Sequence, residues 1–149
     1  MRALAIGGAG FLLAVLWFDL MFDVQSRGHP RDSVPEAVRA SIAAYYARVT
    51  TAARPMNRLV ALAMLTTIGA LAGELARAEL PVWREVTSVV LALGAVGLAA
   101  GRTVANAVRL GTQRDDAVMQ SRLAHRIRGD HIACFTAIAA VLVLQLFPA

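Results

Sequence analysis

The chain has 149 residues, of which 58% are hydrophobic and 6% aromatic, and its mean hydropathy is +0.58. This length fits one domain, and the composition is too apolar for an ordinary soluble domain, in which about half of the residues are apolar. The formal charge of +5 comes from 15 arginines and no lysine. Because these arginines cluster between apolar stretches, the charge indicates a membrane protein in contact with lipid and argues against a nucleic-acid partner.

The first apolar stretch, residues 3–22, is long enough to cross a membrane as a helix. A helix of about 20 residues spans about 30 Å, which is the thickness of the hydrocarbon core of a bilayer. The stretch carries no charge before Asp19, and Asp23 follows four residues later, so both carboxylates lie on one helical face. A carboxylate at membrane depth is costly in free energy, and we therefore expect each to have a partner.

The segment that follows is polar and predicts an amphipathic helix at residues 35–53. Ser33 and Glu36 have the spacing of a capping box, which places Ser33 at the N-cap of this helix. Its apolar residues recur at helical spacing and form one stripe: Val38, Ile42, Tyr45 and Val49. We expect the helix to lie on the membrane surface, with its tyrosines at the headgroup level, or to pack against the end of a helix bundle.

Three more apolar stretches predict membrane-spanning helices, at about residues 59–78, 86–108 and 132–147. Glycines recur along the first two of these, where they allow close contact between helices: Gly69, Gly73, Gly94, Gly97 and Gly101. Between the last two spans, residues 110–128 predict a second amphipathic helix, which Thr112 or Gln113 opens and Gly129 caps. The expected fold class is all-α, an integral membrane four-helix bundle with two cytoplasmic amphipathic helices, in one domain over residues 1–149.

The distribution of arginine predicts the orientation. Segments 24–58 and 102–130 hold six arginines each, whereas the turn at 74–85 holds two. Positively charged residues stay on the cytoplasmic side, so both long connections are expected inside and both termini outside. The composition, rich in alanine and with arginine as its only basic residue besides histidine, is typical of high-GC bacterial genomes. We therefore expect a multi-pass protein of a bacterial cytoplasmic (inner) membrane.

This orientation gathers polar residues from all four spans near the cytoplasmic surface. The set comprises Asp19, Asp23, Asn57, Arg58, Arg102, Asn106, Asp130 and His131. In one interpretation the set is structural, and Asp19 and Asp23 form ion pairs with arginines at the ends of other spans. Arg102 is the first expected partner of Asp19 and Arg58 the second, because the predicted topology places both in the same leaflet.

The alternative interpretation is a site that binds a metal ion or transfers protons. Its residues would be Asp19, Asp23, His125 and His131, since carboxylates and imidazoles are suitable metal ligands and proton relays. The spacing is not specific, and Asp130-His131 lacks the Glu-x-x-His pattern of di-iron sites in helix bundles. The sequence identifies no cofactor, and both interpretations stay open.

Polar residues end the first span, and a basic segment with Arg126, Arg128, Asp130 and His131 leads into the fourth. This layout, with four spans in about 150 residues, resembles small bacterial membrane proteins of the anthrone-oxygenase-like group. The resemblance covers the order of spans, and no catalytic residue of that group can be matched to a position here. It implies a four-helix membrane bundle and, with less weight, an oxygenase activity.

The primary functional hypothesis is a non-catalytic integral membrane protein, either an accessory subunit of a larger complex or a homo-oligomer. It is based on the glycine-rich helix faces, on the absence of a phosphate-binding loop, a nucleophile elbow or a CxxC pair, and on the small polar portion of the chain. One alternative is a small membrane oxygenase or redox enzyme with a cytoplasmic-side site around Asp19 and His131. Another is a proton- or ion-coupled transporter in which Asp19 is the coupling residue. Whether the protein is an enzyme stays open.

Overall fold

The structure is a computed structural model and describes residues 1–52, 54–78 and 80–147, in which all regular secondary structure is helical. Its α-helices are α1 (Arg2–Asp23), α2 (Glu36–Ala47), α3 (Arg54–Arg77), α4 (Val82–Leu98), α5 (Val104–Thr112) and α6 (Ala117–Leu146). A 3-10 turn at Val24–Ser26 follows α1, a π-helical turn at Arg48–Ala52 follows α2, and another at Ala99–Thr103 joins α4 to α5. The predicted all-α class is confirmed.

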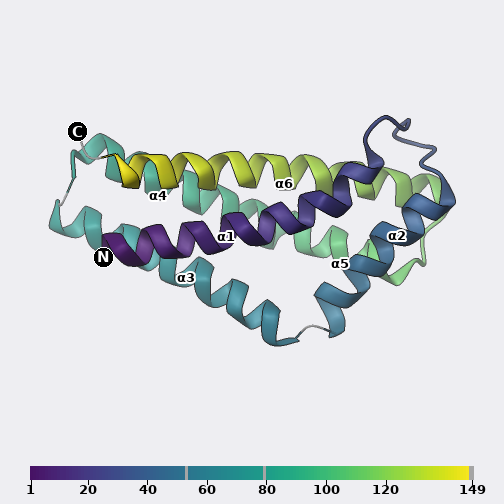
Figure 1. Cartoon of the computed structure of the whole chain (residues 1–149), viewed down its shortest axis with the longest axis horizontal. Helices are drawn as coiled ribbons and strands as arrows, with labels where there is room; N and C mark the ends of the chain where they lie inside the picture. The colour runs from purple at the N-terminus through teal and green to yellow at the C-terminus, as the bar shows by residue number, and fades with distance from the viewer. Residues whose placement is uncertain (53, 79, 148–149) are drawn as a thin grey trace.

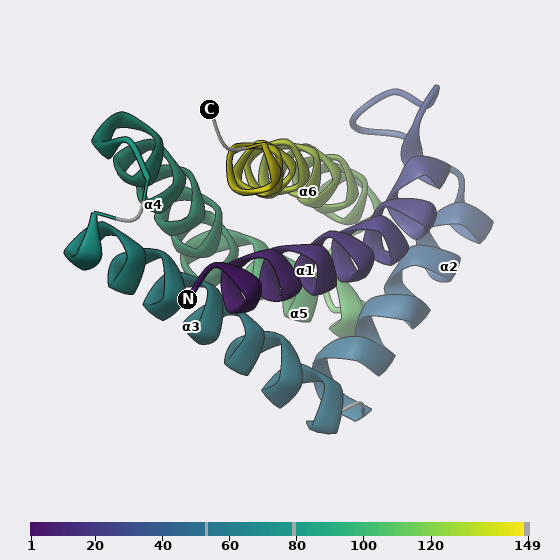
Figure 2. The ribbon, with the colours of Figure 1, turned by 60° about the vertical axis from the view of Figure 1, so that its left-hand side comes forward.

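Four helical segments are long and apolar enough to cross a membrane: Arg2–Ser26, Pro55–Arg77, Val82–Thr112 and Ala117–Leu146. Their helices pack in a ring, because α1 contacts α6 and α3, and α4 also contacts α6 and α3 (Figures 1 and 2). This contact pattern is that of a four-helix bundle. Both termini lie at one end of the bundle, and α2 and α5 lie at the opposite end (Figure 1).

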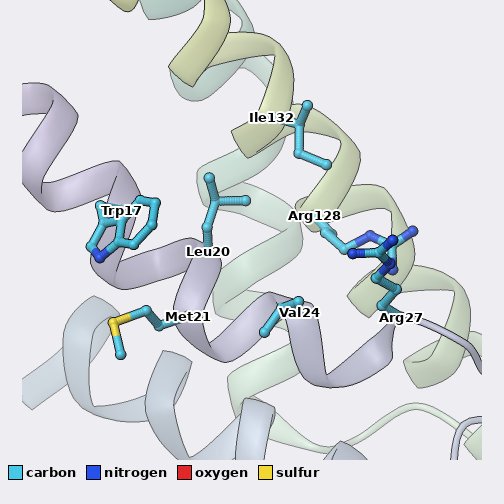
Figure 3. A pocket seen from close by; sticks show the side chains of 7 residues that line it. All are labelled: Trp17, Leu20, Met21, Val24, Arg27, Arg128 and Ile132. Carbon is cyan, nitrogen blue, oxygen red and sulfur yellow. The ribbon is translucent and has the colours of Figure 1, made fainter.

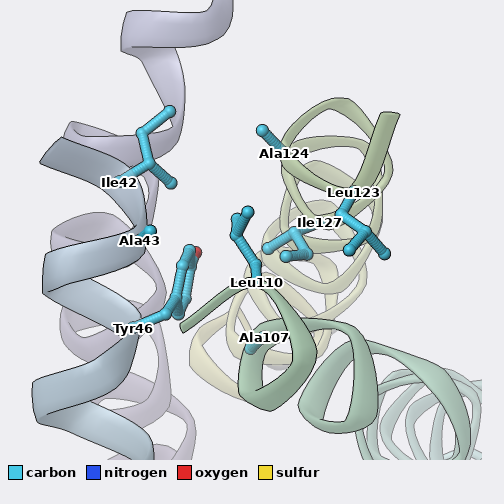
Figure 4. Close-up of a cluster of buried hydrophobic side chains, with 8 residues drawn as sticks. All are labelled: Ile42, Ala43, Tyr46, Ala107, Leu110, Leu123, Ala124 and Ile127. Atoms are coloured by element: carbon cyan, nitrogen blue, oxygen red, sulfur yellow. The ribbon is translucent and has the colours of Figure 1, made fainter. Parts of the chain in front are cut away.

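The bundle core is built from small side chains at the end near the termini and from larger ones at the other end. In the ring of long helices, alanines pack with Leu12, Leu71, Ile138 and Val141. At the opposite end α2, α5 and α6 enclose the largest apolar cluster (Figure 4), which consists of Ile42, Ala43, Tyr46, Ala107, Leu110, Leu123, Ala124 and Ile127. The apolar stripe predicted for the first amphipathic helix therefore packs on the end of the bundle.

Helix α2 begins later than the sequence suggested. Pro35 occupies its N-cap position and no side chain caps the helix, so the predicted role of Ser33 as N-cap is wrong. Pro35 has no N–H to be satisfied and an extended ψ of 145°, which suits the residue before the first turn. Val34, just before it, is anchored instead through its backbone N–H, which donates to the Ser121 hydroxyl over 3.1 Å.

The second predicted amphipathic helix does not exist as a separate element. Gln113 ends α5 in the left-handed conformation (φ 52°), and Asp116 caps α6 by accepting a hydrogen bond from the Met119 N–H over 2.7 Å. From there α6 runs without interruption to Leu146, so Gly129 lies inside a helix and is no cap. A single helical glycine costs only about 1 kcal/mol relative to alanine, which the packing of α6 offsets.

Two arginines bind the last carbonyls of α6 at the end of the bundle where the termini lie. The Arg2 Nε donates to the Gln145 carbonyl over 2.8 Å, and the Arg84 guanidinium donates to the carbonyls of Leu144 and Phe147. The last four carbonyls of a helix have no partner within the helix, and the helix dipole makes this end negative. Arg2 and Arg84 thus stabilise the C-terminal end of α6 from two neighbouring helices.

Candidate functional site

Five polar or ionisable side chains from three helices meet where α1 ends. Asp19 and Asp23 come from α1, Tyr45 and Tyr46 from α2, and His131 from α6. The four-residue spacing of the carboxylates on α1 points both toward α2 and α6, as the sequence predicted for one helical face. We call this group the carboxylate–histidine cluster. It unites Asp19, Asp23 and His131, three of the four residues that the sequence proposed for a metal or proton site, with two tyrosines that were not proposed for it.

Asp23 is the innermost member and is fully buried. Its Oδ1 accepts a hydrogen bond from the Tyr46 hydroxyl over 2.6 Å, and its Oδ2 lies 2.7 Å from the Nδ1 of His131. An ionised carboxylate only accepts hydrogen bonds, so the geometry assigns a proton to Nδ1. Two donors thus compensate the Asp23 carboxylate for the water that it loses on burial.

Asp19 lies one turn earlier and closer to the surface. Its Oδ1 accepts a hydrogen bond from the Tyr45 hydroxyl over 2.6 Å, while its Oδ2 faces the Nε2 of His131 at 3.9 Å. The second distance is too long for a hydrogen bond, but it brings an ion pair into reach when the imidazole is protonated. His131 therefore lies between two carboxylates, with Nδ1 directed at one and Nε2 at the other.

The two tyrosines act as neutral donors. Burial, together with the charges of the neighbouring aspartates, raises the pKa of both Tyr45 and Tyr46 far above that of a free phenol. Both hydroxyls therefore keep their protons at any physiological pH. The Tyr45 ring is fixed by stacking on Phe22, with 3.9 Å between ring centroids and 9° between ring planes.

The predicted ion pair between Asp19 and Arg102 is wrong. Arg102 binds Asp130, with its Nε 3.0 Å from Oδ2, and the Thr103 hydroxyl donates to the same oxygen over 3.2 Å. The physical reason is the ring of helices, because α1 and α4 are not neighbours in it, and among the described residues the backbone of α1 does not approach the turn that carries Arg102. Asp130 on α6 does face that turn. Its carboxylate is only 3% exposed, against 15% for Asp19, and therefore gains more from the charge of the Arg102 guanidinium.

The second choice of partner, Arg58, is also wrong. Arg58 is exposed at the beginning of α3, and among the arginine side chains that the structure describes none forms an ion pair with Asp19. Asn57 is exposed there too, and its amide donates to the Thr50 carbonyl over 3.2 Å. Asn106 is half-buried on α5 and takes no part in the cluster's hydrogen bonds. The predicted polar set therefore divides into the cluster, the Arg102–Asp130 pair and separate residues.

His125 lies apart from His131 although both belong to α6. It lines a pocket of about 720 Å³ outside the carboxylate–histidine cluster, together with Arg102, Arg126 and Asp130. In the part of the chain that the structure describes, no three His, Cys, Asp or Glu side chains converge to share a metal ion. The four residues of this hypothesis are therefore not brought to one point, although Asp19, Asp23 and His131 meet in the carboxylate–histidine cluster.

Sequence reasoning missed Tyr45 and Tyr46 as members of the site, because it assigned both to the membrane headgroup level. A signal for them was present, since the two carboxylates were predicted to lie at membrane depth and to need donors, and α2 carries two hydroxyls on or beside its apolar stripe. The chain was also compared with protein-family models, curated proteins and solved structures, and none of these comparisons gave a match.

Proposed function

We propose that this chain is a multi-pass integral membrane protein without catalytic activity of its own, which works by lateral association with other membrane subunits or with a second copy. The observation that supports this most directly is the outer face of α4. Gly94 and Gly97 on α4 and Gly101 in the π-helical turn after it follow one another at helical spacing, and a Cβ added at any of them would meet nothing within 4 Å. The face is therefore uncovered in the single chain and thin enough for another helix to approach closely.

The residues around these glycines are apolar and exposed. Val90 and Leu93 precede the glycines and Val104 follows them, with exposed fractions between 50% and 61%. Large apolar side chains are also exposed along the other long helices: Trp17, Phe18, Leu62, Leu65, Ile132 and Val143. An apolar surface of this extent supports a lipid environment, because a soluble monomer rarely exposes one.

The proposal includes an orientation in a bacterial cytoplasmic membrane. Both arginine-rich segments, 24–58 and 102–130, lie at the end of the bundle with α2 and α5, and the termini lie at the opposite end (Figure 1). Because positive charge is retained in the cytoplasm, we assign the α2–α5 end to the cytoplasm and both termini to the outside.

Disulfide crosslinking in native membranes tests the association. In a Cys134→Ala background, Val90→Cys on the glycine face should form crosslinked species, either dimers or adducts with a partner subunit. Leu65→Cys is the matched control, since Leu65 is also apolar and more than half exposed but lies on α3. A Gly97→Ile exchange should abolish the Val90→Cys crosslink without changing membrane insertion. A protein that inserts but is crosslinked at neither position, and that is purified as a monomer without partners, contradicts the proposal.

A second candidate, proton handling in a transporter, is favoured by the carboxylate–histidine cluster. Ionisable side chains at membrane depth mark proton pathways by default, and here an imidazole lies between two carboxylates. Protein reconstituted in liposomes should then dissipate an imposed pH gradient faster than empty liposomes, and Asp19→Asn should remove the difference. Asp116→Asn serves as the control, since asparagine also caps a helix. The oxygenase alternative stays a prediction of the resemblance.

A further inference from the structure

A groove of about 440 Å³ runs along the C-terminal half of α1 where it faces α6 (Figure 3). Its walls are apolar and consist of Trp17, Leu20, Met21, Val24 and Ile132. Two arginines, Arg27 after the end of α1 and Arg128 on α6, extend their guanidinium groups to the same end of the groove (Figure 3). The groove is thus apolar along its length and strongly positive at one end.

Neither of these arginines has an acidic partner among the described residues. Arg102, Arg109 and Arg122 each form an ion pair with an aspartate, whereas no carboxylate lines the groove. Two neighbouring cations without a counter-ion repel each other and raise the free energy of the empty groove, and an anion bound between them would lower it.

We propose that this groove binds an anionic phospholipid, with the phosphate held between Arg27 and Arg128 and an acyl chain along the apolar wall. Arginine is suited to this because its planar guanidinium donates two parallel hydrogen bonds to phosphate oxygens. The position also fits, since Arg27 directly follows the first membrane-spanning segment, where phospholipid headgroups lie. The inference rests on the proposed function in that the protein must be embedded in a bilayer.

The apolar wall is the reason to prefer a lipid over free phosphate. Trp17 lies ten residues before Arg27, about 15 Å at helical rise, which is about half of the 30 Å hydrocarbon core of a bilayer and places Trp17 at the depth of an acyl chain. A small hydrophilic anion would use the arginines and leave this wall empty. A phospholipid uses both ends of the groove.

Trp17 provides the measurement, because it lines the groove and the other tryptophan, Trp83, lies at the opposite end of the bundle on α4. The full-length chain carrying Trp83→Phe is reconstituted in phosphatidylcholine vesicles that contain a small fraction of lipid with brominated acyl chains. Quenching of Trp17 by brominated phosphatidylglycerol is compared with quenching by brominated phosphatidylcholine at the same fraction. We expect the anionic lipid to be preferred by about fivefold for each arginine, or about 25-fold for the pair.

The variants Arg27→Gln and Arg128→Gln should each lower this preference about fivefold, and the double variant should abolish it. Arg126→Gln is the matched control, since Arg126 lies on the same helix two residues away and lines the other pocket. Arg27 is exposed in a turn, so its exchange keeps the test valid even if Arg128→Gln folds poorly.

Three results would overturn the lipid site: equal quenching by both lipids, an equal loss of preference in Arg126→Gln, or displacement by inorganic phosphate at millimolar concentration. The last result would indicate a site for free anions. Membrane insertion, the part of the proposed function on which this site rests, could also fail. That failure is distinguishable from the three results above, because a protein outside the bilayer would show no quenching by either brominated lipid.

Discussion

At the scale of single residues, the carboxylate–histidine cluster shows how a bundle of apolar helices accommodates two aspartates without arginine. Asp23 has no exposure and two donors, whereas Asp19 retains some exposure and has one short hydrogen bond. Neutral phenols suit this position, since they donate to a carboxylate without the desolvation cost of a guanidinium. Loss of the tyrosine hydrogen bond should therefore cost more free energy at Asp23 than at Asp19.

This difference predicts that the same substitution, tyrosine to phenylalanine, lowers the free energy of unfolding by different amounts at the two positions. Tyr46→Phe leaves the fully buried Asp23 with one donor fewer and should lower the free energy of unfolding by about 2–3 kcal/mol. Tyr45→Phe should cost about 1 kcal/mol or less, because water can replace the lost donor at the more exposed Asp19. Denaturation of both variants in the same detergent measures the difference, and equal losses would mean that Asp23 is not the more dependent carboxylate.

The ion pairs predict which residues are energetically coupled. Exchanging Arg102 for alanine leaves Asp130 buried without its cation, so the single changes Arg102→Ala and Asp130→Ala should lose more stability in sum than the double change does. Asp19→Ala and Arg102→Ala should simply add, since no contact joins them. Two double-mutant cycles that share the Arg102→Ala variant distinguish the pairs, and coupling between Asp19 and Arg102 would contradict the helix arrangement.

At the scale of elements, close contact between helices depends on particular glycines. A Cβ at Gly111 on α5 would lie 2.8 Å from the backbone nitrogen of Ala47, and one at Gly8 on α1 would lie far inside contact distance of the Thr67 hydroxyl. The first contact involves backbone that cannot rotate away, so α2 and α5 approach each other only because Gly111 has no side chain. That approach holds α2, and with it both tyrosines, at the end of α1.

Gly111→Ala should therefore destabilise the protein by about 1–3 kcal/mol, the usual cost of overpacking. Gly129→Ala is the matched control, because a Cβ at this position of α6 meets nothing within 4 Å. Since alanine favours helix over glycine, this control should be neutral or stabilising by up to about 1 kcal/mol. Thermal unfolding of the two variants compares them directly, and similar behaviour would show that α2 and α5 are not in close contact.

At the scale of the whole molecule, the ring of four long helices places the termini at one end and α2 and α5 at the other (Figure 1). An even number of long helices returns the chain to the end at which it started, which agrees with termini at a common end. The charge distribution follows the same division, with twelve of the fifteen arginines in segments 24–58 and 102–130.

Single cysteines in a Cys134→Ala background test this orientation. Arg31→Cys and Arg114→Cys lie in exposed turns at the α2–α5 end and should be protected from an impermeant label in intact cells. Pro81→Cys is exposed just before α4, at the opposite end, and should react. Labelling at Arg31→Cys and Arg114→Cys with protection at Pro81→Cys would invert the orientation.

The all-α class and the four long apolar helices follow from the amino-acid sequence, because helix length and hydropathy are local properties that do not depend on neighbouring helices. The sequence also predicted that Asp19, Asp23 and His131 lie at one end of the bundle, since each stands at a fixed distance along its own helix. The continuity of α6 through Gly129 could not be predicted, because tertiary packing offsets a local penalty of about 1 kcal/mol.

The partners of the charged groups could not be predicted either. Which side chain faces Asp19 depends on which helices are neighbours in the ring. The packing of α2 and α6 against the end of α1 brings Tyr45 and His131 to Asp19, while Arg102 binds Asp130.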